Sequence, residues 1–96
     1  MEVINISQLK EDLENSDSLY FYKEIKRVVN GTKKVNSMNI TREKVKLIVK
    51  TDVKGDTYLT DQSNEIKCVL TDNSIIYKSQ RNSYVIKKSG AMIFIV

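Results

Sequence analysis

The sequence predicts a small, mainly antiparallel β domain with a short helix near its N-terminus. Between Lys44 and Asp72, three segments alternate apolar and polar residues with the period of two that is typical of strands. Turn-forming residues separate them, with Lys54-Gly55-Asp56 after the first segment and Asp61 to Asn64 after the second. One face of this meander is apolar and the other carries lysines and a tyrosine. We therefore expect a sheet with one buried face and one basic, hydrated face.

Length and composition are those of one globular domain, residues 1–96. The chain has 96 residues, of which 41% are hydrophobic and 29% charged, enough for a single core. The longest apolar run, Ala91 to Val96, is far shorter than the roughly 20 residues that span a bilayer. The chain also lacks a start that resembles a signal peptide. We expect a cytoplasmic protein without membrane association.

The chemistry-bearing residue types are few. The chain has one cysteine, Cys68, and no histidine. This composition excludes an internal disulfide, a multi-cysteine zinc site and the usual general base of catalysis. Cys68 falls on the apolar face of its segment, where a buried structural thiol is expected. We predict no catalytic residues, no metal and no cofactor.

The first expected element is a helix from Ile6 to Glu14. Ser7 is a plausible N-cap, and Leu9 and Leu13 provide one apolar stripe at i, i+4 spacing. The acidic residues on the opposite side of this helix are expected to face solvent.

Residues Leu19 to Val29 are compatible with two structures. Apolar residues recur at helical spacing, and Gly31 follows the last of them, so a helix stays open. Aromatic and β-branched residues dominate, however, and favour a strand. In that case Val29-Asn30-Gly31-Thr32 forms a hairpin turn, Thr32 to Val35 returns as a basic strand, and Asn36 to Ile40 is a polar connector.

The central meander has three expected strands. In the first, from Lys44 to Lys50, Val45, Leu47 and Val49 alternate with lysines. In the second, Thr57 to Thr60, Leu59 faces the core and Tyr58 the other side. In the third, the inward residues are Ile66, Cys68 and Leu70, and the outward residues are Lys67 and Val69.

Three further strands are expected after the meander. They are Ser74 to Ser79, Ser83 to Lys88 and Ala91 to Val96, with turns at Gln80 to Asn82 and at Ser89-Gly90. The last strand is apolar on both faces. We therefore expect it to be central in a closed sheet or to be covered by a partner protein or a second copy.

Charge is distributed unevenly along the chain. Residues 1–20 carry a net charge of −4 and residues 21–96 a net charge of +8, and no acidic residue follows Asp72. Such a field attracts polyanions, of which nucleic acid is the commonest inside cells. A lysine-rich surface that only increases solubility is the alternative.

Short motifs add a family resemblance. They are Ile6-Ser7-Gln8-Leu9, then Val45-Lys46-Leu47-Ile48, and then Tyr58 to Ile66 with Asp61 retained. Together they resemble the OB-fold core of replication-protein-A-like single-stranded DNA binders, most of all the middle subunit. Val49 stands where that family has a glycine, and the glycines of the family's second motif are also absent. The resemblance implies a small, antiparallel five- to six-stranded OB-like barrel with a short N-terminal helix.

The resemblance also implies a binding site. In OB folds a single strand crosses the exposed face of the central strands and is held by base stacking and phosphate contacts. We therefore predict binding of single-stranded nucleic acid, most simply DNA, with little sequence specificity. Tyr58 is the first stacking candidate. The predicted site residues are Lys46, Lys50, Tyr58, Lys67, Tyr77, Lys78, Arg81 and Tyr84.

Two other interpretations remain open. A protein-interaction module, of viral or mobile-element origin, would dock through a sheet edge or through Ala91 to Val96. A nuclease would use Asp56 and Glu65-Ile66-Lys67, whose spacing matches two Mg²⁺-binding carboxylates and a lysine that orients the attacking water.

Overall fold

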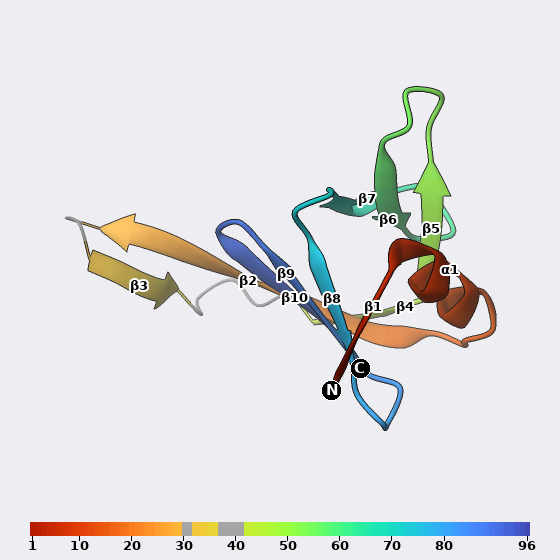
Figure 1. Cartoon of the computed structure of the whole chain (residues 1–96), viewed down its shortest axis with the longest axis horizontal. Coiled ribbons are helices and arrows are strands. Elements are labelled where there is room, and N and C mark those ends of the chain that lie inside the picture. The colour runs from red at the N-terminus through yellow and green to blue at the C-terminus, as the bar shows by residue number, and fades with distance from the viewer. Residues whose placement is uncertain (30–31, 37–41) are drawn as a thin grey trace.

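The computed structural model describes residues 1–29, 32–36 and 42–96, and these are mainly β. They form one helix and ten strands arranged as two antiparallel sheets (Figure 1). The elements in chain order are β1 (Glu2–Ile4), α1 (Ile6–Glu14), β2 (Leu19–Val29), β3 (Thr32–Asn36), β4 (Glu43–Val45), β5 (Ile48–Thr51), β6 (Thr57–Thr60), β7 (Ile66–Leu70), β8 (Ile75–Lys78), β9 (Tyr84–Lys88) and β10 (Ala91–Ile95).

The larger sheet has the strand order β1-β8-β9-β10-β2-β3, with β4 also paired to β2, and the smaller sheet has the order β5-β6-β7. The predicted mainly β class and the short N-terminal helix are confirmed. In the part of the chain that the structure describes, neither sheet closes into a barrel. Strand β1 was not expected from the sequence and pairs with β8 at one edge of the larger sheet.

Helix α1 has the predicted bounds, but its N-cap differs from the prediction. Asn5, with extended φ and ψ of −91° and 172°, accepts a hydrogen bond from the Gln8 backbone N–H at 2.8 Å. Ser7 lies inside the first turn, so the Ser7 cap is wrong. The reason is that β1 pairs with β8 up to Ile4, which leaves the next residue extended. No helix among the described residues has the length and the apolar character needed to cross a membrane.

Strand β2 settles the ambiguity over residues 19–29, and the helical alternative is wrong. One edge of β2 pairs with β10, and the other pairs with β4 and then with β3. The predicted return strand is β3, which also includes Asn36, the first residue of the expected connector Asn36 to Ile40. The turn residues Asn30 and Gly31 lie outside the described residues, as do residues 37–40 of that connector.

The expected strand from Lys44 to Lys50 is divided between the two sheets. Its first part is β4, which pairs with β2, and its second part is β5, which pairs with β6. The chain passes from one sheet to the other at Lys46 and Leu47, and Leu47 is buried. The Lys46 ammonium donates hydrogen bonds to the backbone carbonyls of Leu13, at 2.7 Å, and of Ser16. A cation at the C-terminal end of α1 interacts favourably with the helix dipole.

The smaller sheet follows the predicted alternation except at one position. Leu59, Cys68 and Leu70 are buried, as expected. Ile66, however, is 56% exposed, so the prediction that it faces the core is wrong. The physical reason is a shift of register between β6 and β7. Leu59 is opposite Cys68, but Thr60 is opposite Ile66, so Ile66 lies on the other side of the sheet from Cys68.

The predicted turns are present where the structure describes them. The Asp52 backbone N–H donates to the Asp56 carbonyl at 2.9 Å, and Gly55 between them has a φ of +87°. Such a positive φ is readily adopted by glycine. Asn64 and Asn82 have φ values of 65° and 57° in the turns before β7 and β9. These two turns match the polar clusters that the sequence indicates.

Strand β10 is central in the larger sheet, between β9 and β2, which confirms the predicted central position. The closed sheet that was expected around it is not formed by the described strands. Ile93 and Ile95 are fully buried on one face, while Met92 and Phe94 are half-buried on the other.

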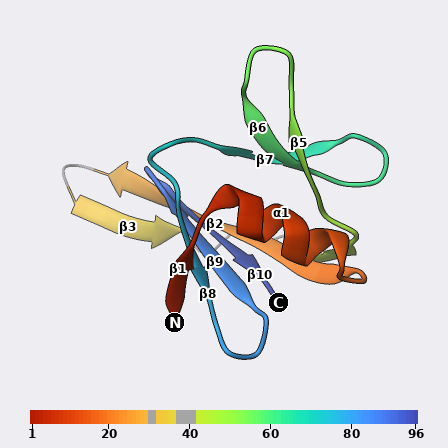
Figure 2. The same ribbon diagram turned by 45° about the vertical axis from the view of Figure 1, so that its right-hand side comes forward.

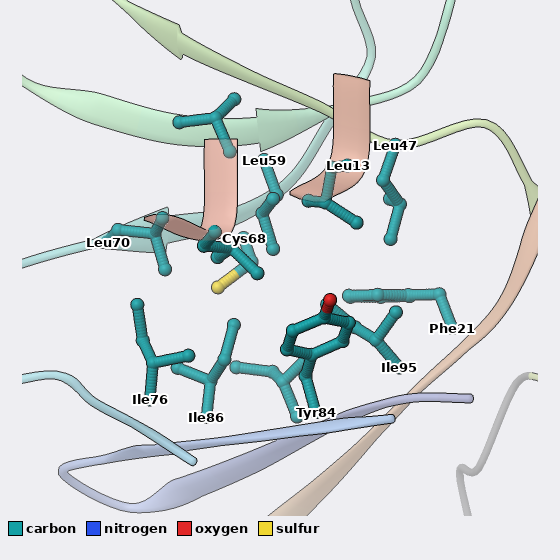
Figure 3. Packing of buried hydrophobic residues seen from close by; sticks show 13 residues of the cluster. Leu13, Phe21, Leu47, Leu59, Cys68, Leu70, Ile76, Tyr84, Ile86 and Ile95 are labelled. Atoms are coloured by element: carbon teal, nitrogen blue, oxygen red, sulfur yellow. The ribbon is translucent and has the colours of Figure 1, made fainter. Parts of the chain in front are cut away.

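The hydrophobic core lies between the larger sheet, on one side, and α1 with the smaller sheet, on the other. Figure 2 shows α1 lying across the larger sheet, with β5, β6 and β7 on the same side. Figure 3 shows side chains from the two layers meeting, with Leu13 and Leu59 on one side and Ile86 and Ile95 on the other. We call the core-facing side of the larger sheet the inner face and the opposite side the outer face.

A polar cluster fastens α1 to this sheet. Lys78 forms an ion pair with Asp12 at 2.8 Å, and the Tyr84 hydroxyl donates to the same carboxylate at 2.9 Å. The expectation that all acidic residues of the helix face solvent is therefore wrong for Asp12, although Glu11 and Glu14 are exposed. Burial by itself raises the pKa of Asp12, but the hydrogen bonds from Lys78, Tyr84 and Gln8 outweigh it and lower the pKa. Burial and the bond to Asp12 raise the pKa of Tyr84.

We predict that Asp12→Asn lowers the free energy of unfolding at neutral pH, by about 1–2 kcal/mol. The amide lacks the charge that pairs with Lys78. Because the pKa of Asp12 is lower in the folded state, the unfolded chain binds more protons as the pH falls through the acidic range. The contribution of Asp12 is thus complete above its unfolded pKa and is lost on acidification. Urea denaturation at neutral pH and near pH 3 should show the difference between wild type and variant shrinking. The control is Glu14→Gln, on an exposed side chain of the same helix, and an equal loss in that variant would contradict the assignment.

We also predict that two adjacent residues of β10 differ strongly in their effect on stability. Ile93 is 0% exposed in the core, so Ile93→Ala should lower the free energy of unfolding by about 2–5 kcal/mol. Met92 lies half-exposed on the outer face, and Met92→Ala should cost clearly less. Thermal and denaturant unfolding of the two variants measures this. Equal losses would mean that the outer face is packed as tightly as the core.

Candidate nucleic-acid interface

The structure does not bring the eight predicted site residues together on one surface. Lys50, Tyr58 and Lys67 belong to the smaller sheet, and Lys46 lies between the sheets with its ammonium on the end of α1. The other four lie on the β8–β9 hairpin of the larger sheet. These are Tyr77, Lys78, Arg81 and Tyr84.

In the smaller sheet, Lys50 and Tyr58 are directly opposite one another on β5 and β6. The Tyr58 hydroxyl donates to the Asp52 carboxylate, and the Lys50 ammonium donates to the Asn64 side-chain oxygen. The bond to Asp52 raises the pKa of Tyr58 to about 12 and holds the pKa of Asp52 below its usual range. These side chains border a shallow depression that Ile66 also lines. A carboxylate next to the tyrosine makes this depression less favourable for a phosphate.

Lys67 is surrounded by carboxylates and is not a free cation. Its ammonium lies 2.5 Å from Glu43, 3.5 Å from Glu65 and 3.7 Å from Asp61, and its side chain is 11% exposed. The hydrogen bond to Glu43 is the main reason why the pKa of Lys67 is raised. Three negative charges around one positive charge leave this part of the smaller sheet acidic.

The nuclease interpretation requires Asp56 and Glu65 to share a metal ion. Asp56 directly precedes β6, whose first residue, Thr57, is opposite Leu70, whereas Glu65 is next to the other end of the β6–β7 pair. Four residues of extended strand separate the two ends, which corresponds to roughly 13 Å. The two carboxylates therefore do not form the pair that this motif needs.

On the β8–β9 hairpin, alternate residues have different environments. Lys78 and Tyr84 point to the inner face and bind Asp12, as described above, and Tyr84 is only 3% exposed. Arg81 lies exposed in the turn. Tyr77 lies on the outer face, where the Lys87 ammonium is 5.9 Å from the centre of its ring.

The outer face carries a row of residues that the register aligns across four strands. Tyr77 on β8 is opposite Val85 on β9, which is opposite Phe94 on β10, which is opposite Tyr22 on β2. Their neighbours along each strand point into the core, so these four side chains share the outer side. The rings of Tyr22 and Phe94 stack with centroids 4.9 Å apart and an angle of 11° between their planes. We call Tyr77, Val85, Phe94 and Tyr22 the outer row.

Cations lie at both ends of the outer row. At one end is Lys87, over Tyr77. At the other end, next to Tyr22, Tyr20 is 40% exposed and lies under Arg42, at 4.4 Å from the ring centre, and Lys44, at 5.8 Å. Within the described residues, none of these three cations forms an ion pair with a carboxylate. Flat aromatic surfaces and unpaired positive charge thus occur together on one face.

Of the aromatic residues on this surface, sequence reasoning predicted only Tyr77 and missed Tyr20, Tyr22 and Phe94. It also missed Val85 and the three cations, Arg42, Lys44 and Lys87. The signal was present, because Tyr20 and Tyr22 have the two-residue spacing of one strand face and Phe94 lies in a strand without a polar side. Only the register of β10 against β2 brings the aromatic rings together.

No protein-family model matches this chain, and no curated protein or solved structure matches it either. The arrangement of side chains on the two sheets is therefore the basis on which its function can be inferred.

Proposed function

We propose that this chain binds single-stranded nucleic acid on the outer face of the larger sheet. Bases stack on the rings of the outer row and on Tyr20, and Arg42, Lys44 and Lys87 contact the phosphates. The observation that carries the proposal is the combination of four aromatic rings with three cations on the sheet face opposite the core.

The spacing of the rings suits a nucleic-acid strand. Neighbouring strands of a sheet are about 4.8 Å apart, so Tyr77 and Phe94, two strands apart, are separated by roughly 10 Å. This distance leaves room for two or three unstacked bases along the row. Stacking accepts every base, because every base has a π-face, and it contributes about 1–3 kcal/mol per base. Binding with little sequence specificity follows from such a surface.

The outer face is a better candidate than the smaller sheet, on which the sequence-based prediction was centred. In the smaller sheet the lysine at position 67 is neutralised, and Asp52 holds the hydroxyl of Tyr58. The outer face also carries Glu24, opposite Met92, but its three cations sit on aromatic rings and form no ion pair with a carboxylate among the described residues. A phosphate is therefore attracted more strongly to the outer face.

The OB-like interpretation belongs to this proposal. The resemblance of residues 45–66 to single-stranded DNA binders supports the same ligand class. The passage of the chain from the larger to the smaller sheet after Val45 is consistent with a first strand that serves two sheets. In an OB-like domain the bound nucleic acid would also contact Tyr58. We therefore use Tyr58 as the comparison for the outer row in binding experiments.

A second candidate function is docking of a protein, in particular a second copy of this chain. The observation in its favour is apolar exposure on and beside the outer face. Val3 is 66% exposed, Ile75 43% and Val96 48%. Exposed apolar residues on a sheet face are typical of protein interfaces.

We predict that a short fluorescently labelled dT oligomer binds, and that its affinity falls as salt increases. Three phosphate contacts would give a slope of about −2 in a plot of log K against log salt. Fluorescence anisotropy over a series of salt concentrations measures this. Sizing of the protein in parallel tests the second candidate. A stable dimer that binds no oligomer even at low salt would replace our proposal with protein docking.

We further predict that Tyr22→Leu and Phe94→Leu each weaken oligomer binding about 5- to 100-fold while the chain stays folded. Leucine keeps apolar bulk on the sheet but removes the π-face on which a base stacks, a contact of about 1–3 kcal/mol. The matched control is Tyr58→Leu on the smaller sheet, and thermal melting confirms folding. If Tyr58→Leu weakens binding while the two outer-row variants do not, the strand lies on the smaller sheet instead.

A further inference from the structure

Strand β2 extends beyond the body of the larger sheet. Strand β10 pairs with β2 only as far as Ile25, and β4 pairs with its first three residues. From Ile25 to Val29 the pairing partner of β2 is β3, in a register that opposes Ile25 to Asn36 and Val29 to Thr32. These paired parts of β2 and β3 project from the rest of the molecule (Figure 1). We call residues 25–29 of β2 and 32–36 of β3 the arm.

The arm contains a large share of the positive charge of the chain. It contains four basic residues, Lys26, Arg27, Lys33 and Lys34, and no acidic residue. The whole chain has 16 basic and 12 acidic residues, so outside the arm 12 basic residues are balanced by 12 acidic ones. The net charge of +4 is therefore located in the arm.

This charge distribution lowers the stability of the paired strands of the arm in the absence of a ligand. Arg27 and Lys34 are directly opposite in the register, and like charges at such positions destabilise an antiparallel pair. A two-stranded hairpin is also only marginally stable by itself in water. A polyanion beside the arm would remove the repulsion, and a nucleic-acid backbone supplies regularly spaced negative charges.

The arm is continuous with the proposed interface. The outer row ends at Tyr22, and the same strand, β2, runs from there for seven residues to Val29. Those residues span roughly 23 Å at the rise of a strand. A nucleic-acid strand that leaves the row at Tyr22 therefore meets the start of the arm.

We infer that the arm is a second contact for the same nucleic-acid strand and holds its phosphate backbone beyond the sheet. This inference rests on the proposed function. The outer row binds bases over a few nucleotides, and the arm adds phosphate contacts that only a longer strand can reach. Affinity should therefore increase with the length of the strand, and the increase should depend on the arm.

The test compares two labelled probes, a short dT oligomer of about 4 nucleotides and a longer one of about 15, binding to the intact chain. The variant is Lys33→Gln/Lys34→Gln, on β3, which pairs with β2 alone. We expect wild-type affinity to be clearly higher for the longer probe. The variant should bind the longer probe about tenfold more weakly, the size expected for the loss of two lysine–phosphate ion pairs, and should bind the short probe unchanged. Its salt slope for the longer probe should be smaller by about 1.4.

The matched control is Lys10→Gln/Lys54→Gln, which removes the same charge from exposed positions on α1 and on the β5–β6 turn. An equal loss in this control would mean that only net charge matters, and would overturn the inference. A variant that binds the longer probe as wild type does would overturn it as well. If wild type binds neither probe at low salt, the proposed function itself fails. If both probes bind with equal affinity, the outer face is sufficient and the arm is not part of the site.

Discussion

The larger sheet has an apolar inner face that must be removed from water, and the rest of the structure depends on how this is done. Ile86, Ile93 and Ile95 on this face are completely buried, and they are covered by Leu9 of α1 and Leu59 of the smaller sheet. Burial of each such side chain stabilises the fold by about 1.5–3 kcal/mol. Because α1 and the smaller sheet both lie over the inner face, the described elements place no second layer on the outer face. Strand β10, which is apolar on both sides, therefore packs one side into the core and leaves the other side available for other contacts.

The same packing determines which positive charges are available to a ligand. Lys46 is bound to the end of α1, Lys67 to carboxylates around the smaller sheet, and Lys78 to Asp12. Each of these lysines joins two elements that are distant in sequence. A partly buried charge needs such partners, because its hydration is lost when it is covered. Among the residues that the structure describes, the cations over the rings of Tyr20 and Tyr77 form no ion pair with a carboxylate. The net charge of the chain equals the charge of the four basic residues of the arm.

Much of the local structure could be predicted, because it depends on short patterns. The bounds of α1, the strand at residues 19–29 with its return strand β3, and the turn at Gly55 follow from the apolar stripe of the helix, β propensity and positive φ. The errors concern positions where the pairing of strands determines the local structure. Ile66 is exposed because of the register shift between β6 and β7, and Asn5 replaces Ser7 as the cap because β1 pairs as far as Ile4. The candidate site was predicted only in part, since Tyr77 belongs to the outer face while Tyr84 belongs to the core.

The sequence by itself determined the mainly β class, the order of most elements and the excess of positive charge after residue 20. It also determined which residues share a side in strands with regular alternation, because that depends on the period of two. The register shift at Ile66 breaks this alternation in β7. The tertiary structure alone decided which side is covered, since several strands, β10 above all, are apolar on both sides. It also decided that Tyr22 and Phe94, 72 positions apart in the chain, stack on each other. Contacts of this kind arise from strand pairing over long sequence separations, which local patterns do not encode.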